Sequence, residues 1–267
     1  MILFIKVFNM SKENKYTTEQ ITYTKQWTDN LLSFKVSRNE AYKFIPGQFA
    51  RLGLKKADNS IVWRPYSIVS ADYDEELEFY SIIVPDGEFT QIVKDIKFGD
   101  EILVDKTNYG LLTTDRFENG KDLWLLSTGT GLAPFISILY QFDIWEQYEK
   151  IFLVHCVRTA NELTYQDTIN AFYTHEYYGE LVKDKLVYIK VVTREQTGGD
   201  LYGRITDLIE NNKLEEYVNL KLSLENSRIM ICGNPDMVDD TRKILAARGM
   251  TVSKRSNPGN MAVENYW

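Results

Sequence analysis

The 267-residue sequence predicts two domains, an antiparallel β-barrel followed by an α/β domain built on a parallel sheet. Two observations predict this fold. Residues 16–118 contain short strand patterns separated by turn signals, which is typical of a closed antiparallel barrel. Residues 119–267 instead alternate nearly continuous apolar runs with helical patterns, as expected where helices cover both faces of a parallel sheet. We expect residues 1–15 to form an N-terminal tail.

The strands expected in the first domain are short, and some carry aromatic and β-branched residues. Turn signals such as Pro46-Gly47 and Gly99-Asp100 separate them. A helix is expected over Gln91–Ile96, after the turn Pro85-Asp86-Gly87. The predicted strands are Leu31–Val36, Gln48–Leu54, Tyr66–Val69, Leu77–Val84 and Glu101–Asp105.

The second domain is expected to contain four strands and several helices. One helix should begin near Phe135, and Thr206–Val218 has an amphipathic pattern. Asn234 is a suitable cap for a helix with Pro235 at its first position, and Gly249 suits its C-terminal end. The predicted strands are Leu123–Leu126, Ile151–Val157, Leu186–Val192 and Arg228–Cys232.

Composition excludes several functional classes. The net charge of -7 argues against a general nucleic-acid binder, which usually needs a basic face. The two cysteines, Cys156 and Cys232, are far apart, which makes a disulfide framework, a zinc finger or a cysteine-ligated cluster unexpected; no metal site is predicted. No apolar run reaches the roughly 20 residues that span a bilayer, and we expect a cytoplasmic protein.

A glycine-rich turn, Thr128-Gly129-Thr130-Gly131, follows the first strand of the second domain and precedes a helix. Two interpretations remain open. Glycines allow backbone amides to approach a phosphate, and the helix N-terminus offers it positive partial charge. The alternative is an ordinary strand-to-helix turn.

Three arginines also point to a phosphate. Arg158 and Arg194 each follow a predicted strand, and Arg204 lies just beyond Gly203. Ligands of parallel sheets gather at the carboxyl ends of the strands, so at least two of these arginines should share that edge with the glycine-rich turn. Arginines bind phosphate bidentately, and NADP differs from NAD by a ribose phosphate. The alternative is that all three are solvated surface residues.

Other motifs carry weaker signals. Arg64-Pro65-Tyr66-Ser67 lies at the predicted start of a strand, and Gly87-Glu88-Phe89-Thr90 precedes a helix and offers a second anion site. Two such sites in two domains suggest two nucleotides. Tyr266-Trp267 ends the chain; Trp267 either stacks on a planar ring or fills a groove of the protein itself. Cys232 is either a buried core residue or borders a cofactor.

Together and in this order, the motifs resemble those of the ferredoxin–NADP(+) reductase family, specifically the bacterial ferredoxin/flavodoxin–NADP(+) reductases, from about Ile21 to Trp267. The resemblance implies a barrel that holds FAD and an α/β domain that binds NADP(H). Residues implied at FAD are Arg64, Tyr66, Ser67, Ile82, Ile83, Val84, Gly87, Thr90, Thr130, Tyr266 and Trp267. Residues implied at NADP are Thr128, Gly129, Gly131, Arg158, Arg194, Arg204, Cys232, Gly233, Asn234 and Pro235. The implied catalytic residues are Ser67, Tyr66, Cys232 and Glu264.

By this resemblance the protein moves electrons between NADPH and a ferredoxin or flavodoxin, and it is a monomer. The carrier would dock on a local basic face that includes Arg51, Lys254 and Arg255. Three alternatives remain open: the reductase component of an oxygenase, a free-flavin reductase, and a non-catalytic flavin-binding sensor. Many oxygenase reductases carry a cysteine-ligated iron–sulfur domain, for which this sequence lacks the cysteines.

Overall fold

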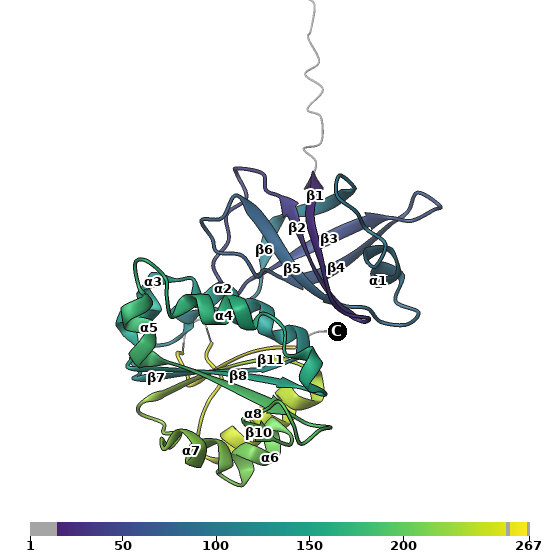
Figure 1. Cartoon of the computed structure of the whole chain (residues 1–267). Coiled ribbons are helices and arrows are strands. Elements are labelled where there is room, and N and C mark those ends of the chain that lie inside the picture. The colour runs from purple at the N-terminus through teal and green to yellow at the C-terminus, as the bar shows by residue number, and fades with distance from the viewer. Residues whose placement is uncertain (1–14, 255–256, 266–267) are drawn as a thin grey trace, which may run out of the picture.

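The structure is a computed structural model that describes residues 15–254 and 257–265. It consists of two sheets, each of six strands. The first sheet forms a barrel that lies above the second, parallel sheet in Figure 1. Tyr266 and Trp267, predicted at FAD, and Arg255, predicted at the carrier, lie outside the described residues.

The barrel is antiparallel, with strand order β4-β3-β6-β1-β2-β5. The two edge strands meet through a bridge between Ile68 and Phe79 and a 2.8 Å hydrogen bond from the Val69 amide to the Glu78 carbonyl oxygen. The sheet is thereby closed, which confirms the predicted barrel. Its strands are β1 (Tyr16–Thr28), β2 (Leu31–Ser37), β3 (Phe49–Lys55), β4 (Ile61–Ser67), β5 (Glu76–Ile82) and β6 (Glu101–Tyr109).

Three sequence expectations for the barrel were wrong in position or incomplete. Strand β1 was not among the predicted strands because it is mostly polar, and hydrogen bonds to β2 and β6 hold it in the sheet. Strand β4 begins at Ile61, so the segment from Arg64 to Ser67 lies at the end of a strand rather than at its start. Helix α1 (Glu88–Val93) begins three residues earlier than expected, directly after Gly87.

The second sheet is parallel throughout, with strand order β10-β9-β8-β7-β11-β12. The four predicted strands are present as β7, β8, β9 and β11, and the two additional strands lie at the edges of the sheet. The edge strands were missed because β10 has only two residues and β12 lies near the C-terminus, after an irregular segment. The strands are β7 (Asp122–Thr128), β8 (Lys150–Val157), β9 (Leu186–Val192), β10 (Leu201–Tyr202), β11 (Ser227–Gly233) and β12 (Met261–Asn265).

Helices cover both faces of this sheet (Figure 1). The face toward the barrel carries α2 (Ala133–Leu139), α3 (Phe142–Gln147), α4 (Gln166–Phe172) and α5 (Gly179–Lys185). The opposite face carries α6 (Ile205–Glu210), α7 (Lys213–Val218) and α8 (Pro235–Ala247). This arrangement explains why the strands between them are continuous apolar runs.

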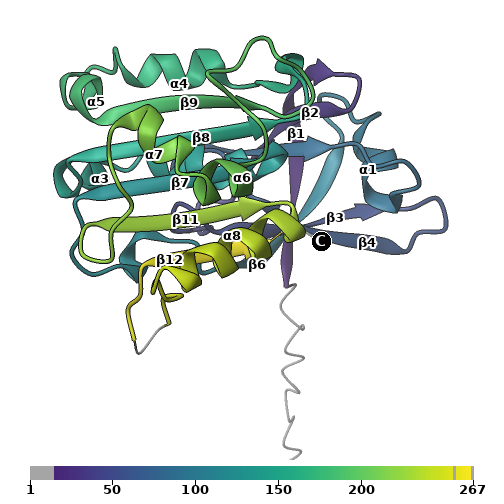
Figure 2. The same ribbon diagram turned by 90° about the horizontal axis from the view of Figure 1, so that it is seen from below.

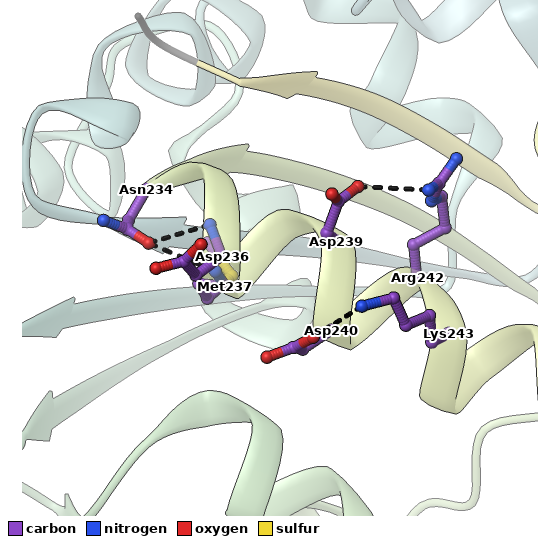
Figure 3. Close-up of polar contacts among 7 residues, drawn as sticks. All are labelled: Asn234, Asp236, Met237, Asp239, Asp240, Arg242 and Lys243. Carbon is purple, nitrogen blue, oxygen red and sulfur yellow. Dashed lines mark hydrogen bonds and ion pairs between the residues drawn. The ribbon is translucent and has the colours of Figure 1, made fainter.

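The helix predicted over Thr206–Val218 is in fact two helices, α6 and α7. Asn212 adopts a left-handed conformation with φ of 58° and separates them. The apolar pattern spans both helices because Leu208 and Leu214 are buried in the same core. Helix α8 begins and ends as predicted: the Asn234 side chain accepts hydrogen bonds from the Asp236 and Met237 amides (Figure 3), and Gly249 follows the helix with φ of 91°.

The two domains share buried apolar contacts. Leu31, Val69 and Tyr80 of the barrel belong to the same core cluster as Phe135 and Tyr165 of the second domain. A buried hydrogen bond of 2.7 Å from Ser137 Oγ to the Ser70 carbonyl oxygen joins α2 to the barrel. The segment that follows β4 is therefore held against α2. Among residues 15–254 and 257–265, no helix is long and apolar enough to cross a membrane.

Candidate active site

A cavity of about 280 Å³ opens between the barrel and the second domain. The end of β4 and the end of β5 form two of its walls, and the turn before α1 forms a third. Thr130 reaches it from the parallel-sheet domain. The cavity is therefore a site at which the two domains meet. Its lining is mostly apolar and consists of Arg64, Pro65, Tyr66, Ser67, Tyr80, Ser81, Ile82, Val84, Gly87, Phe89, Thr90 and Thr130.

Tyr66 supplies an aromatic wall of this cavity. Its ring lies 5.3 Å from the Phe89 ring centroid and makes edge contacts with Phe34 and Phe79. Its hydroxyl lies 2.9 Å from Ser81 Oγ. Burial raises the pKa of Tyr66 to about 12, so the phenol stays neutral at physiological pH. A neutral ring held by three others is a rigid surface on which a planar ligand can stack.

The turn after β5 is held by Thr90. Its hydroxyl accepts a hydrogen bond from the Val84 amide at 3.2 Å and lies 3.1 Å from the Val84 carbonyl oxygen. A Cβ added at Gly87 would lie only 2.5 Å from Thr90 Oγ1, so a larger residue here would displace the Thr90 side chain from the turn. Side chains alternate along the strand: Ile82 and Val84 line the cavity, whereas Ile83 packs against the barrel core.

A carboxyl group from the second domain reaches the end of β4. Glu264 Oε1 accepts a hydrogen bond from Ser67 Oγ at 3.3 Å. Burial raises the pKa of Glu264 to about 7, which allows it to hold or release a proton near neutral pH. The second carboxylate oxygen of Glu264, Oε2, lies close to Gly110. A Cβ added at Gly110 would be only 2.9 Å from this oxygen. Cys232, fully buried, pairs with Glu264 in the register of β11 and β12.

The glycine-rich turn after β7 packs against the end of β11, backbone on backbone. A Cβ added at Gly131 would lie 2.3 Å from the Cys232 carbonyl oxygen. Gly233 has φ of 137°, and a Cβ there would lie 2.1 Å from Thr128 Oγ1. That hydroxyl accepts a hydrogen bond from the Asn234 amide at 2.9 Å. Gly131 and Gly233 therefore allow these two turns to pack closely against each other, while Gly129 faces open space.

The three predicted arginines lie at one edge of the parallel sheet. Arg158 follows β8, Arg194 follows β9, and Arg204 follows β10. The Arg194 amide donates a hydrogen bond to the Arg158 carbonyl oxygen at 2.8 Å. The Gly203 amide, next to Arg204, donates to the Val192 carbonyl oxygen at 3.0 Å. Backbone hydrogen bonds between neighbouring segments therefore hold the chain at the three arginines. All three side chains are exposed. The parallel strands, including β8 and β11, run toward the barrel (Figure 2), so this edge is the one that carries the cavity.

Within the described ranges, ion pairs with acidic side chains are formed by Arg51, Arg242 and Arg248, and not by these three arginines. Exposed guanidinium groups that follow neighbouring strands favour an anion as their ligand. The arrangement can therefore hold a phosphate at the carboxyl ends of β8, β9 and β10.

Sequence reasoning missed several residues of the site. Pro65, Tyr80, Ser81 and Phe89 line the cavity but were not predicted there. For Tyr80, the two-residue alternation of the strand was an available signal, since it is followed at every second position by Ile82 and Val84. Gly110 was also missed, because its role depends on Glu264, which is 154 positions further along the chain. Arg51, predicted at a carrier-binding face, lies 3.7 Å from Asp105 in an ion pair.

Comparison with known proteins agrees with this arrangement. The oxidoreductase FAD-binding domain family matches residues 22–110, and the oxidoreductase NAD-binding domain family matches residues 125–243. A ferredoxin–NADP reductase from Pseudomonas aeruginosa is 43% identical over 250 residues, covering 92% of this chain and 96% of that protein. A flavodoxin/ferredoxin–NADP reductase from Buchnera aphidicola is 35% identical over 256 residues, covering 95% and 100%.

A solved structure is also similar over the whole fold. A ferredoxin NADP+ reductase from Neisseria gonorrhoeae, with bound FAD and NADP, superposes with a TM-score of 0.88 at 38% identity, covering 96% of this chain and 100% of that one. The strand orders, the cavity between the domains and these similarities lead to one conclusion: the chain belongs to the family of ferredoxin/flavodoxin–NADP reductases.

Proposed function

We propose that the protein transfers electrons between NADPH and a ferredoxin or flavodoxin, with FAD bound in the cavity between barrel and parallel sheet. The observation that carries the proposal is the meeting of two elements: the cavity beside Tyr66 is bordered by Thr130, from the turn after β7, and the three arginines follow other strands at the same edge of the parallel sheet. Family membership and the FAD- and NAD-binding domain matches support it.

The residues of the cavity fit a flavin. Its walls are mostly apolar, and the neutral Tyr66 ring offers a stacking surface. Thr90 and Gly87 hold the turn at one side, and Arg64, exposed at the rim, can pair with a diphosphate. When bound, FAD accepts a hydride from NADPH and passes on the electrons singly.

The chain contributes binding, orientation and one proton-holding group. Arg158, Arg194 and Arg204 bind the ribose phosphate of NADP(H) and so determine its preference over NAD(H). Gly131 and Gly233, where no side chain fits, shape the turns that face the nicotinamide end. Together, the arginines and these turns position the reacting rings, and such positioning supplies much of the rate enhancement.

Ser67 and Glu264 form the pair that holds and exchanges a proton in the proposed reaction. Ser67 Oγ donates to Glu264 Oε1 at 3.3 Å, and the pKa of Glu264 near 7 allows it to exchange a proton with solvent at physiological pH. Cys232, opposite Glu264 in the sheet register, fills the buried floor beside this pair. We assign the catalytic roles to Ser67, Tyr66, Cys232 and Glu264 together.

We further propose a FAD-binding domain over residues 16–118, an NADP-binding domain over 119–267, and a monomer that works in the cytoplasm. The two domain matches, at 22–110 and 125–243, support these limits. Tyr266 and Trp267 are proposed to cover the flavin and the adenine of FAD.

The test is anaerobic stopped-flow absorbance of the FAD-loaded protein mixed with NADPH or NADH, followed by a ferredoxin and a flavodoxin. Fast flavin bleaching by NADPH, slow bleaching by NADH and reoxidation by either carrier are expected. A flavin that neither nucleotide bleaches would contradict the proposal and favour a sensor. Bleaching followed by reoxidation only by free flavin would favour a free-flavin reductase.

A further inference from the structure

One short segment connects the arginine edge to the wall of the flavin cavity. Residues 158–165, here called the strap, run from the end of β8 to the start of α4 and include the 3-10 turn Ala160–Glu162. The strap begins with Arg158, at the proposed phosphate site. It ends with Thr164 and Tyr165, which are 2% and 3% exposed. Its two ends therefore belong to two different parts of the site.

The phosphate end of the strap is held by hydrogen bonds within the α/β domain. The Arg158 amide donates to Glu162 Oε2 at 3.0 Å, and the Ala160 amide donates to Glu195 Oε2 at 2.9 Å. The Arg158 carbonyl oxygen accepts from the Arg194 amide. A phosphate that fixes Arg158 and Arg194 therefore also fixes the backbone of the strap.

The other end of the strap is bonded to the barrel. Thr164 Oγ1 donates to the Tyr80 hydroxyl at 2.9 Å, and the Tyr165 hydroxyl donates to Glu78 Oε1 at 2.7 Å. Both acceptors belong to β5, and Tyr80 lines the flavin cavity. The Tyr165 ring also lies between Trp27 at 4.8 Å and Tyr80 at 5.2 Å, so ring packing supports both hydrogen bonds.

The backbone of Tyr165 is unusual. Its φ is 56°, in the left-handed region, which a bulky aromatic residue rarely adopts. Strained conformations of this kind persist where surrounding contacts over-determine them, and they cluster at functional sites. Here the turn sends the side chain to Glu78 of the barrel while the Tyr165 carbonyl oxygen accepts from the Ile169 amide of α4.

We infer that Thr164 and Tyr165 are positioning residues for hydride transfer: through the strap, they hold the arginine edge in a fixed place relative to the Tyr80 wall of the flavin cavity. Both residues are buried, and neither lines the flavin cavity. The inference rests on the proposed function and deepens it, because it names what aligns the two nucleotide sites. A small error in such alignment costs rate rather than affinity.

The test compares Thr164→Val and Tyr165→Phe, each of which removes one hydroxyl and keeps the packing volume. Tyr173→Phe is the matched control, because its hydroxyl donates to the Leu186 carbonyl oxygen within the α/β domain. In the FAD-loaded proteins, we expect the limiting rate of flavin reduction at saturating NADPH to fall about tenfold or more in both strap variants. NADPH affinity and the control should stay near wild type.

A second measurement does not depend on turnover. Adenosine 2′,5′-bisphosphate, which occupies only the phosphate end, should raise the protection of amides from hydrogen exchange in the strap and also in β5 of the wild-type holoenzyme. Tyr165→Phe should retain the response of the strap and lose that of β5. Wild-type reduction rates together with an unchanged β5 response in both strap variants would overturn the inference. If NADPH fails to reduce even the wild-type flavin, the proposed function is wrong, while the exchange response still decides the role of the strap.

Discussion

At the scale of single residues, the most informative group is the carboxyl of Glu264. It comes from the last strand of the parallel sheet, yet it accepts a hydrogen bond from Ser67 of the barrel. Burial raises the pKa of Glu264 from its ordinary 4.5 to about 7. The folded protein therefore binds more protons than the unfolded chain between these values. The stability contributed by this group is complete below about pH 4.5 and is lost as the pH rises through about 7.

The same pKa predicts a pH profile. Reduction of NADP⁺ by a reduced carrier consumes a proton, so its rate should fall as the pH rises through about 7 and Glu264 loses its proton. Glu264→Gln keeps the size and the hydrogen bond but cannot ionise, and it should show a lower rate with no inflection there. Steady-state turnover between pH 5.5 and 9 measures this. A wild-type inflection that persists in Glu264→Gln would assign the proton to another group.

Nucleotide preference also belongs to single residues. Neutralising Arg194 or Arg204 to Gln removes one charge-assisted hydrogen-bonding group, which contributes about 1.5–3 kcal/mol. The KM for NADPH should therefore rise about tenfold to a hundredfold, and that for NADH should change little. Arg242→Gln is the control, because Arg242 pairs with Asp239 on the exposed face of α8. Equal effects on both nucleotides would show that these arginines do not bind the ribose phosphate.

At the scale of the element, helix α8 depends on its cap. Asn234 Oδ1 accepts from the Asp236 amide at 3.0 Å and the Met237 amide at 3.2 Å (Figure 3). Asn234→Ala should lower the free energy of unfolding by about 1 kcal/mol, measured by urea denaturation without NADP(H). Asn234→Asp keeps the acceptor and should be nearly neutral. If the two variants are equally destabilised, the cap is not the source of the loss.

At the scale of the whole molecule, the two domains share a core. Leu31, Val69 and Tyr80 of the barrel pack in one cluster with Phe135 and Tyr165. Loss of either domain would expose this surface, so we expect the holoenzyme to unfold cooperatively. Flavin release, which reports on the barrel, and far-ultraviolet circular dichroism, which reports mainly on the helices of the other domain, should share one denaturant midpoint. Separate midpoints would mean that the interface contributes little.

The sequence by itself determined the order of the two folds and most of their elements. Continuous apolar runs identified β7, β8, β9 and β11. A strand that is covered on both faces is apolar at successive positions, and this pattern can be read from the local sequence. The capping signals at Asn234 and Gly249 likewise placed α8. Arg64, Tyr66, Ser67, Gly87, Thr90 and Thr130 were predicted at FAD through the resemblance of their local motifs to those of the family, and all six line the cavity.

Only the tertiary structure decided the contacts between distant segments. The polar strand β1 buries few apolar side chains and is held mainly by hydrogen bonds to its neighbours, so no local pattern marked it. The space at Gly110 that Glu264 fills and the bonds from Thr164 and Tyr165 to β5 are likewise contacts between groups far apart in the chain. Local patterns record whether a side chain is buried, but the partner against which it is buried is determined only when the two domains pack together.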